Sequence, residues 1–241
     1  MSTWSPTWNV TWVTETGSTN ADVRDAALAG AVDGLVIAAD YQSAGRGRLD
    51  RRWIAPAGAS LLVSVLVRSL AVERWHLSTM AMSLAAADAC RSVAGVGVDI
   101  RWPNDLYVGD RKLAGMLAEG HVTADPASAF VVVGIGINVN WPQELPDEIA
   151  ERAIAVNHVT RRETDRRALL EAVLAGLSGT DWDTVTDRYR SRLSSLGRDL
   201  TITMPRGDVV RGRAVDLDTD GALVVEAADG ERRVVTVGDV S

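Results

Sequence analysis

The chain has little cysteine and no long apolar segment. Of its 241 residues only Cys90 is a cysteine, which excludes an internal disulfide and a cysteine-rich zinc site. Cys90 lies in an alanine-rich apolar stretch, residues 77–93, so we expect a buried structural thiol rather than a nucleophile. No apolar run reaches the ~20 residues that span a bilayer, and no signal peptide opens the sequence. We therefore expect no membrane association and a cytoplasmic location.

Lysine is also scarce. Of the 25 basic residues, 24 are arginine and one, Lys112, is lysine. Such a bias is typical of a genome that favours arginine codons, and it makes a surviving lysine informative. An ammonium group is a compact point charge and a guanidinium is a planar fork, so the two differ in reach and hydration. Lys112 therefore indicates a position where arginine cannot substitute; chance survival on the surface is the alternative.

The protein is acidic, with a net charge of −7 at pH 7, so it lacks the basic surface that general nucleic-acid binding requires. Against this background, residues 45–53 (GRGRLDRRW) gather four arginines and two glycines. Glycine exposes backbone N–H groups to a ligand, and arginine forks bind carboxylate and phosphate oxygens. The segment predicts a loop that closes over a small anion; a solvated basic turn is the alternative.

Hydrophobic periodicity predicts an α+β protein. The strands expected first along the chain are residues 8–14, 35–40, 60–68, 98–100, 106–108, 112–120 and 130–138, with a tight turn at 109–110. The expected helices are residues 19–29, 77–93, 166–177 and 182–196. Strands and helices do not alternate regularly, which favours a mixed or antiparallel sheet flanked by helices over a doubly wound fold.

The last part of the chain has a different character. Turn-forming residues separate four short expected strands, residues 200–204, 209–216, 222–227 and 232–237. This pattern predicts a small β-barrel, so we divide the chain into residues 1–196 and 197–241. A core of that size is too small to be very stable alone, so the barrel is expected to pack on the larger domain.

Polar residues gather where the first helix should begin. Ser18, Thr19 and Asn20 lie at its N-terminus, and Thr19 with Asp22 resembles a capping box. Hydroxyls, an amide and free N–H groups at a helix N-terminus can bind a polar ligand head or an anion. The alternative is that these residues only cap the helix.

Five motifs, in this order, make the chain resemble the biotin protein ligases over essentially its whole length. They are residues 17–20 (GSTN), Gln42 with 45–48 (GRGR), 101–105 (RWPND), 111–115 (RKLAG) and 134–138 (GIGIN). The resemblance implies a catalytic domain related to class II aminoacyl-tRNA synthetases, followed by a small SH3-like barrel. It also implies that ATP activates biotin to biotinyl-5′-AMP, and that biotin passes to a lysine of the biotin carboxyl carrier domain of an acyl-CoA carboxylase.

Site residues follow from the same resemblance. Lys112, Arg48 and Arg51 would be catalytic, with Lys112 bridging the biotin carboxylate and the α-phosphate. Biotin would be bound by Ser18, Thr19, Asn20, Gln42, Gly45, Arg46, Gly47, Arg48, Lys112, Leu113 and Gly115. The nucleotide would contact Arg48, Arg51, Trp53, Arg101, Asn104, Lys112 and Asn138. ATP and biotin are then substrates, and Mg²⁺ accompanies ATP. No residue is assigned as a metal ligand: Asp105 is expected to orient its neighbours, and help in holding Mg²⁺ is the alternative.

The chain departs from the family pattern at three places. Arg101 stands where a lysine is usual, residues 49–50 stand where a glycine is common, and the chain stops a little early, which puts any ATP contact from the tail in doubt. Residues 43–53 are expected to be disordered without ligand and to fold over the adenylate, which would otherwise hydrolyse. No helix-turn-helix precedes Trp8, so a ligase without DNA binding is expected, as a monomer or a homodimer.

Two other functions are kept as alternatives. A lipoate–protein ligase of the same superfamily would use parallel chemistry, but the GRGR loop and the WPND motif argue against it. A non-catalytic biotin or nucleotide sensor would not need Lys112.

Overall fold

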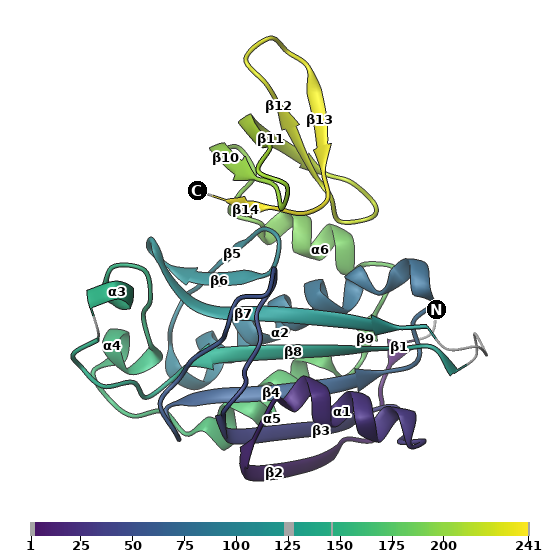
Figure 1. Ribbon diagram of the computed structural model, residues 1–241, viewed down its shortest axis with the longest axis vertical. Helices are drawn as coiled ribbons and strands as arrows, with labels where there is room; N and C mark the ends of the chain where they lie inside the picture. The colour runs from purple at the N-terminus through teal and green to yellow at the C-terminus, as the bar shows by residue number, and fades with distance from the viewer. Residues whose placement is uncertain (1–2, 123–127, 146, 241) are drawn as a thin grey trace.

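The computed structural model describes residues 3–122, 128–145 and 147–240, and two β-sheets dominate it (Figure 1). The larger sheet has seven strands in the order β2-β3-β4-β8-β7-β6-β5. They are β2 (Asn9–Thr16), β3 (Leu35–Gln42), β4 (Ser60–Val67), β5 (Asp99–Arg101), β6 (Asp105–Val108), β7 (Arg111–His121) and β8 (Phe130–Asn138). Only β2 and β3 are parallel neighbours; the other pairs are antiparallel. The predicted mixed sheet is confirmed.

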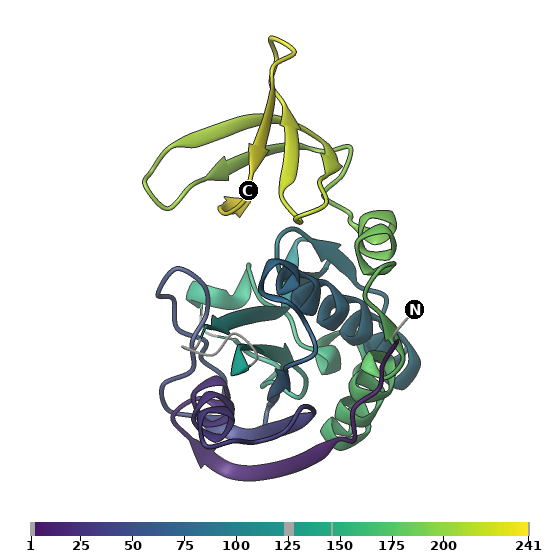
Figure 2. The same ribbon diagram turned by 90° about the vertical axis from the view of Figure 1, so that its right-hand side faces the viewer.

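Helices cover both faces of this sheet (Figures 1 and 2). The helix α1 (Thr19–Leu28) packs on β3, β4 and β8, whereas α2 (His76–Ala94) and α5 (Arg166–Leu177) pack together on the other face. Successive residues of a strand point to opposite faces, so Val132 belongs to the core under α1 and Val131 to the core under α2. Cys90 of α2 is fully buried, and burial raises the pKa of its thiol to about 12, as expected of a structural cysteine.

The smaller sheet lies at one end of the molecule, beyond β5 and β6 (Figure 1). Its antiparallel order is β13-β12-β11-β10-β14. The strands are β10 (Asp199–Thr203), β11 (Val209–Leu217), β12 (Leu223–Glu226), β13 (Arg232–Val235) and β14 (Asp239–Val240). The first four were predicted, whereas two residues are too few for β14 to show a periodic pattern. The indole Nε1 of Trp102 donates to the carbonyl of Gly221 at 2.9 Å, which fastens this sheet to the larger domain.

Several short elements have no counterpart in the sequence prediction. They are the two-stranded sheet of β1 (Thr3–Trp4) and β9 (Thr180–Asp181), the 3₁₀ turn η1 (Val72–Arg74), α3 (Asp147–Ala150) and α4 (Val156–Thr160). The helix α6 (Val185–Arg192) is shorter than predicted because Leu193 leaves the helix to bridge Ile100 of β5. Within the described residues no helix has the length and apolar character needed to cross a membrane.

The start of α1 differs from the prediction. Ser18 rather than Thr19 is the N-cap residue, and no side chain caps the helix. The Thr19 hydroxyl oxygen instead lies 3.0 Å from Gln42 Oε1 and 2.7 Å from Ser64 Oγ. The predicted capping box of Thr19 and Asp22 is therefore wrong, because partners on β3 and β4 engage the hydroxyl that local pairing would have used.

Candidate active site

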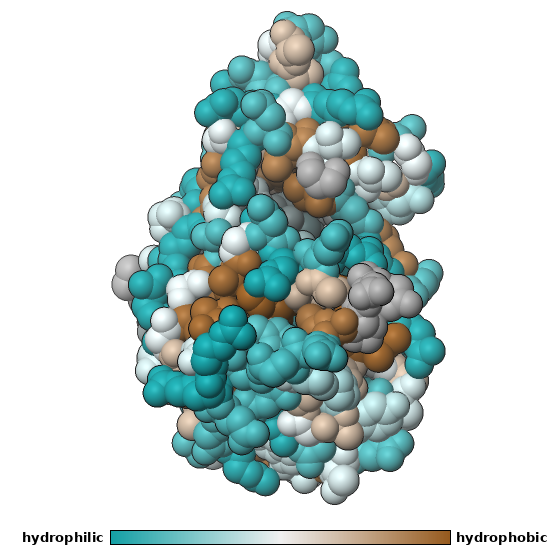
Figure 3. Space-filling model, turned by 90° about the vertical axis from the view of Figure 1, so that its left-hand side faces the viewer, coloured by the Kyte–Doolittle hydropathy of each residue, from teal (hydrophilic) through white to brown (hydrophobic). Residues whose placement is uncertain are grey.

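A cavity of about 1120 Å³ lies on the α1 face of the large sheet, beside the N-terminus of α1. Its floor includes Gly115 of β7 and Gly134 and Gly136 of β8, where the absence of side chains leaves the sheet hollow. Its walls come from segments within 41–56, 101–112, 141–153, 194–200 and 238–240, so the small sheet closes one side. Figure 3 views the molecule from the side of α3 and α4, where apolar side chains gather in a band bordered by hydrophilic ones.

A cradle of buried polar side chains forms one end of the cavity. Ser18, Thr19 and Asn20 are all buried and line it together with Gln42. The backbone N–H of Thr19 donates to Gln42 Oε1 at 2.8 Å, and Ser64 Oγ donates to Asn20 Oδ1 at 2.5 Å. The cradle is thus tied to β3 and β4 and presents hydroxyl and amide groups to a ligand.

Residues 45–53 fold as a small hairpin. The backbone N–H of Trp53 donates to the carbonyl of Gly45 at 3.0 Å, and that of Gly47 donates to the carbonyl of Arg51 at 2.7 Å. A Cβ on Gly45 would lie 2.5 Å from the Trp53 carbonyl oxygen. Only glycine therefore lets the two arms approach this closely.

The turn of the hairpin has a left-handed backbone. Leu49 has a φ of 54° and Asp50 a φ of 59°. This region costs a residue with a Cβ roughly 1–2 kcal/mol but costs glycine nothing. The conformation therefore makes this turn more strained than one built with glycine.

All four arginines of the loop line the cavity, and Arg48 is the least exposed of them. Its Nη1 donates to Asn104 Oδ1 at 2.9 Å, and Asn104 Nδ2 donates to the carbonyl of Met116 at 2.5 Å. Burial lowers the pKa of the Arg48 guanidinium from its ordinary value, and the nearby carboxylate of Asp105 opposes that shift. Arg48 still carries its charge at neutral pH and supplies fixed positive potential inside the cavity.

Arg46 and Arg51 tether the loop at two points. Arg46 donates from both terminal nitrogens to Glu119 of β7, each at 2.8 Å. Arg51 forms an ion pair with Asp239 of β14, and the hydrogen bond to Asp239 raises the pKa of Arg51. The loop therefore spans from the large sheet to the small one.

Lys112 lies in the cavity at the start of β7. Its Nζ is 2.7 Å from Asp105 Oδ1 and 5.8 Å from the centre of the Trp53 ring. A Cβ on Gly115 would come within 3.0 Å of Nζ, so glycine there makes room for the ammonium group. The one lysine of the chain thus brings a positive charge to the cavity lining, paired with the Asp105 carboxylate.

The Trp53 indole covers the glycine floor. A Cβ on Gly136 would lie 2.5 Å from Trp53 Nε1, and one on Gly115 would lie 3.0 Å from the ring. The Nε1 atom is buried and has no hydrogen-bond partner within the described residues. The indole thus offers an unused donor and an aromatic face, and its expected stacking on adenine stays a prediction.

Arg101 forms hydrogen bonds with the turn between β6 and β7. Its Nη2 donates to the carbonyl of Gly109 at 2.7 Å and to Asp110 Oδ1 at 3.0 Å, and its guanidinium lies 4.1 Å from the centre of the Tyr107 ring. Arg101 lines the cavity, but in this arrangement it braces the hairpin that carries Lys112.

Asn138 ends β8 at the cavity wall. Its Nδ2 donates to the carbonyl of Ile154 at 3.1 Å, while Oδ1 is buried with no partner in the described part of the chain. The described residues contain no group of three or more histidine, cysteine, aspartate or glutamate side chains that could hold a metal.

Two expected site residues do not line the cavity. Leu113 is fully buried in the core that packs under α2, on the opposite face of the sheet, so its side chain does not wall the ligand as expected. Gly45 shapes the loop from within and does not line the cavity. Strict alternation would place Leu113 on the same face as Gly115, two residues later. The register shift between β6 and β7 leaves Leu113 without a paired residue, and this bulge turns its side chain to the opposite face.

Motif reasoning missed several residues that the structure brings to the site. They are Ser64, Glu119, Asp239, and Trp141 with Leu145 and Ile149 on the wall beyond β8. Two of them had a signal in the sequence. Ser64 is a polar residue inside an otherwise apolar strand, and Glu119 is a charge four residues after Gly115 on the same strand face.

Comparison with known proteins gives consistent relatives. The model of the biotin/lipoate A/B protein ligase family matches residues 13–138, and that of the biotin protein ligase C terminal domain matches residues 195–241. The chain is 35% identical over 240 residues to the biotin–[acetyl-CoA-carboxylase] ligase of Mycobacterium tuberculosis, which covers 95% of this chain and 86% of that protein. It is 27% identical over 225 residues to the bifunctional ligase/repressor BirA of Bacillus subtilis, which covers 90% of this chain and 69% of that protein.

A solved structure supports the same relationship. The biotin protein ligase from Aquifex aeolicus in complex with biotin and ATP matches with a TM-score of 0.80 and 25% identity, over 97% of each chain.

Proposed function

The chain belongs to the biotin/lipoate A/B protein ligase family, and we propose that it activates biotin with ATP and attaches it to a carrier protein. In the first step a carboxylate oxygen of biotin attacks the α-phosphorus of ATP. The bond to the bridging oxygen breaks, and biotinyl-5′-AMP and pyrophosphate form. In the second step a neutral lysine amine of a biotin carboxyl carrier domain attacks the acyl carbon, AMP leaves, and the amine loses a proton to solvent.

One geometric observation carries this proposal. Gly134 and Gly136 are two residues apart on one strand face, a spacing of about 6.8 Å. Asn20 of the cradle lies against the first glycine, and Trp53 lies against the second. Gly136 is paired with Gly115, which in turn is next to the Lys112 ammonium. A polar ligand head in the cradle would therefore place a carboxylate on a short tail at Lys112.

The charges suit the first step. A carboxylate and a triphosphate repel each other, so bringing them together requires fixed positive charge in a site shielded from water. Lys112 and Arg48 provide it within one cavity, and Arg51 adds a third charge at the rim. We assign the ureido head to Thr19 and Gln42, the α-phosphate to Lys112 and Arg48, and adenine to Trp53 and the apolar wall.

The residues present also fit a magnesium ion that arrives with ATP. Mg²⁺ prefers oxygen ligands and usually takes one or two from the protein, with phosphates and water supplying the rest. Asn138 offers a buried oxygen that has no partner among the described residues, and Asp105 offers a carboxylate. Bound there, the ion would neutralise phosphate charge.

The test is incubation with biotin, Mg-ATP and a candidate carrier domain, followed by intact mass measurement of the carrier. The expected result is one biotinyl group added to the carrier. Parallel reactions with lipoate test the lipoate–protein ligase. Adenylate formation from lipoate but not from biotin would overturn the assignment, and binding of biotin without any turnover would favour a sensor.

The loop supplies a prediction of its own. Its tethers from Arg46 and Arg51 are partly exposed ion pairs, which contribute little by themselves. Residues 43–53 should therefore exchange their amide hydrogens more quickly in the free protein than when biotin and ATP are both present. Hydrogen exchange measured by mass spectrometry checks this, and equal protection with and without the ligands would contradict it.

A further inference from the structure

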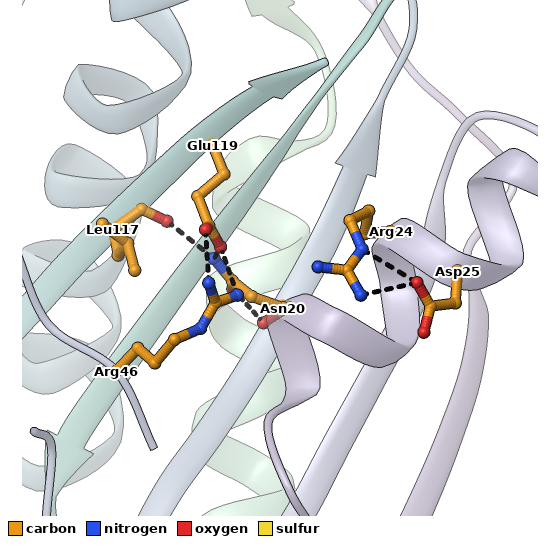
Figure 4. A network of polar contacts seen from close by, with 7 residues as sticks. Asn20, Arg24, Asp25, Arg46, Leu117 and Glu119 are labelled. Atoms are coloured by element: carbon orange, nitrogen blue, oxygen red, sulfur yellow. Dashed lines mark hydrogen bonds and ion pairs between the residues drawn. The ribbon is translucent and has the colours of Figure 1, made fainter. Parts of the chain in front are cut away.

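Glu119 connects the arginine loop to the polar cradle, and the proposed chemistry gives it no part. It lies on β7 and faces the α1 side together with Gly115 and Leu117. The Glu119 carboxylate accepts a hydrogen bond from each terminal nitrogen of Arg46 at 2.8 Å. It also accepts one from Asn20 Nδ2 at 2.7 Å (Figure 4). Glu119 therefore joins the loop, the start of α1 and the large sheet at a single point.

This carboxylate also determines the direction of a chain of hydrogen bonds. An ionised carboxylate only accepts, so the Asn20 amide must turn its Nδ2 toward Glu119 and its Oδ1 toward Ser64. Ser64 Oγ then donates its one proton to Asn20 Oδ1 at 2.5 Å. With that proton used, the 2.7 Å contact between Ser64 and Thr19 requires Thr19 Oγ1 to be the donor.

This chain of hydrogen bonds runs through buried side chains next to the cavity, so its direction matters. Asn20, Ser64 and Thr19 are all buried, so a polar group left without a partner would be costly. Thr19 contacts Gln42 Oε1 through both its amide and its hydroxyl. When the Thr19 hydroxyl donates its proton to Ser64, Thr19 Oγ1 remains an acceptor on the cavity side. Gln42 Oε1 then accepts only from the backbone N–H of Thr19.

We propose that Glu119 is a positioning residue for the ligand head: it orients the donors and acceptors of the cradle and fastens Arg46 over them. The ligand class that fits such a cradle is a compact ring carrying both N–H donors and a carbonyl acceptor, as in the ureido ring of biotin. This inference rests on the proposed function for the identity of the ligand. The structural part of the inference, namely the contact between Glu119 and Arg46 and the oriented chain of hydrogen bonds, does not depend on the proposed function.

The first test is Glu119→Gln, which keeps the size of the side chain and removes its charge. The dissociation constant for biotin alone, measured by calorimetry, should rise about tenfold to a hundredfold, the loss expected for hydrogen bonds to a charged group. The KM for biotin should rise in parallel, while kcat at saturating biotin changes by less than about threefold. Glu119→Asp, which keeps the charge, should recover part of the affinity.

The matched control is Glu231→Gln. Glu231 forms a comparable pair with Arg233, at 2.7 and 3.0 Å, in the small sheet and away from the cavity. The Glu231→Gln variant should bind biotin with the same affinity as the wild-type protein. In the protein without substrates, Glu119→Gln should speed amide exchange in residues 43–53 and at the start of α1, and Glu231→Gln should not.

A second variant separates the two roles of Glu119. Ser64→Ala interrupts the hydrogen-bond chain but leaves the contact between Glu119 and Arg46, so it should weaken biotin binding without changing exchange in the loop. Glu119→Gln with wild-type biotin affinity and wild-type exchange overturns the proposal, as does Ser64→Ala with wild-type affinity. If the wild-type protein binds no biotin, the proposed function fails, and the exchange data still decide the tether.

Discussion

Replacing Lys112 by alanine should lower the rate of biotinyl-adenylate formation by about a hundredfold to a thousandfold, the loss seen when one well-aimed electrostatic group is removed. A second effect adds to this loss. Asp105, now held 2.7 Å from the ammonium, would remain as an unpaired negative charge where two anionic substrates must meet. The measurement is pyrophosphate release with biotin and Mg-ATP, before any carrier is added.

The fold should survive this substitution. The Lys112 side chain is 32% exposed, so little packing is lost. The backbone of Lys112, which accepts from Ile154 N–H at 3.0 Å and donates to the carbonyl of Arg152 at 2.8 Å, is unaffected. Arg91→Ala, on the exposed side of α2, is the control for loss of one cation, and its rate should match the wild type. A near-normal rate for Lys112→Ala would remove the assigned role.

Two further variants distinguish charge from shape. Lys112→Arg should also be slow, because the planar fork does not fit beside Gly115, where the ammonium already approaches closely. Asp105→Asn combined with Lys112→Ala should be faster than Lys112→Ala alone if the unpaired carboxylate repels substrate. Equal rates for these two proteins would assign the whole loss to the missing ammonium.

Strong periodic patterns predicted the fold well. The strand 130–138 and the helix 166–177 have the predicted ends, because long apolar runs and helical spacing are properties of the segment itself. The pair of β1 and β9 could not be predicted in this way. Each strand has two residues, and they are joined across most of the chain. Pairing between segments so far apart in sequence depends on the folded core and not on the local sequence pattern. In that core the ring centres of Trp4 and Trp182 are 5.3 Å apart.

The site was predictable to the level of which residues meet, but not how they are held. Motif residues from α1, the arginine loop and β7 do gather around one cavity. The partners of these residues could not be predicted from the motifs. Glu119 on β7 and Asp239 on β14 are distant from the loop in sequence, and only the folded sheets bring them next to Arg46 and Arg51. Thr19 shows the same limit. Its sequence context favoured local capping, and the neighbouring strands provided better partners.

Gly134→Ala tests the cradle from below. A Cβ at this position would overlap Asn20 Oδ1 and would lie 3.1 Å from Ser64 Oγ, so the Asn20 amide must move away. Overpacking of this kind costs about 1–3 kcal/mol. Since the displaced group orients the cradle, we expect a loss of about tenfold to a hundredfold in biotin affinity, with a smaller effect on ATP binding.

The matched control is Gly97→Ala. Its new Cβ would have only an Arg91 side-chain nitrogen nearby, at 3.9 Å, and Gly97 has no left-handed φ. This substitution should leave biotin affinity unchanged and the free energy of unfolding unchanged or slightly higher, because alanine has fewer unfolded conformations. Calorimetry with biotin and chemical denaturation of all three proteins separate the two effects. Wild-type biotin affinity in Gly134→Ala would show that the ligand head does not depend on Asn20, and the oriented chain from Glu119 would lose its route to the ligand.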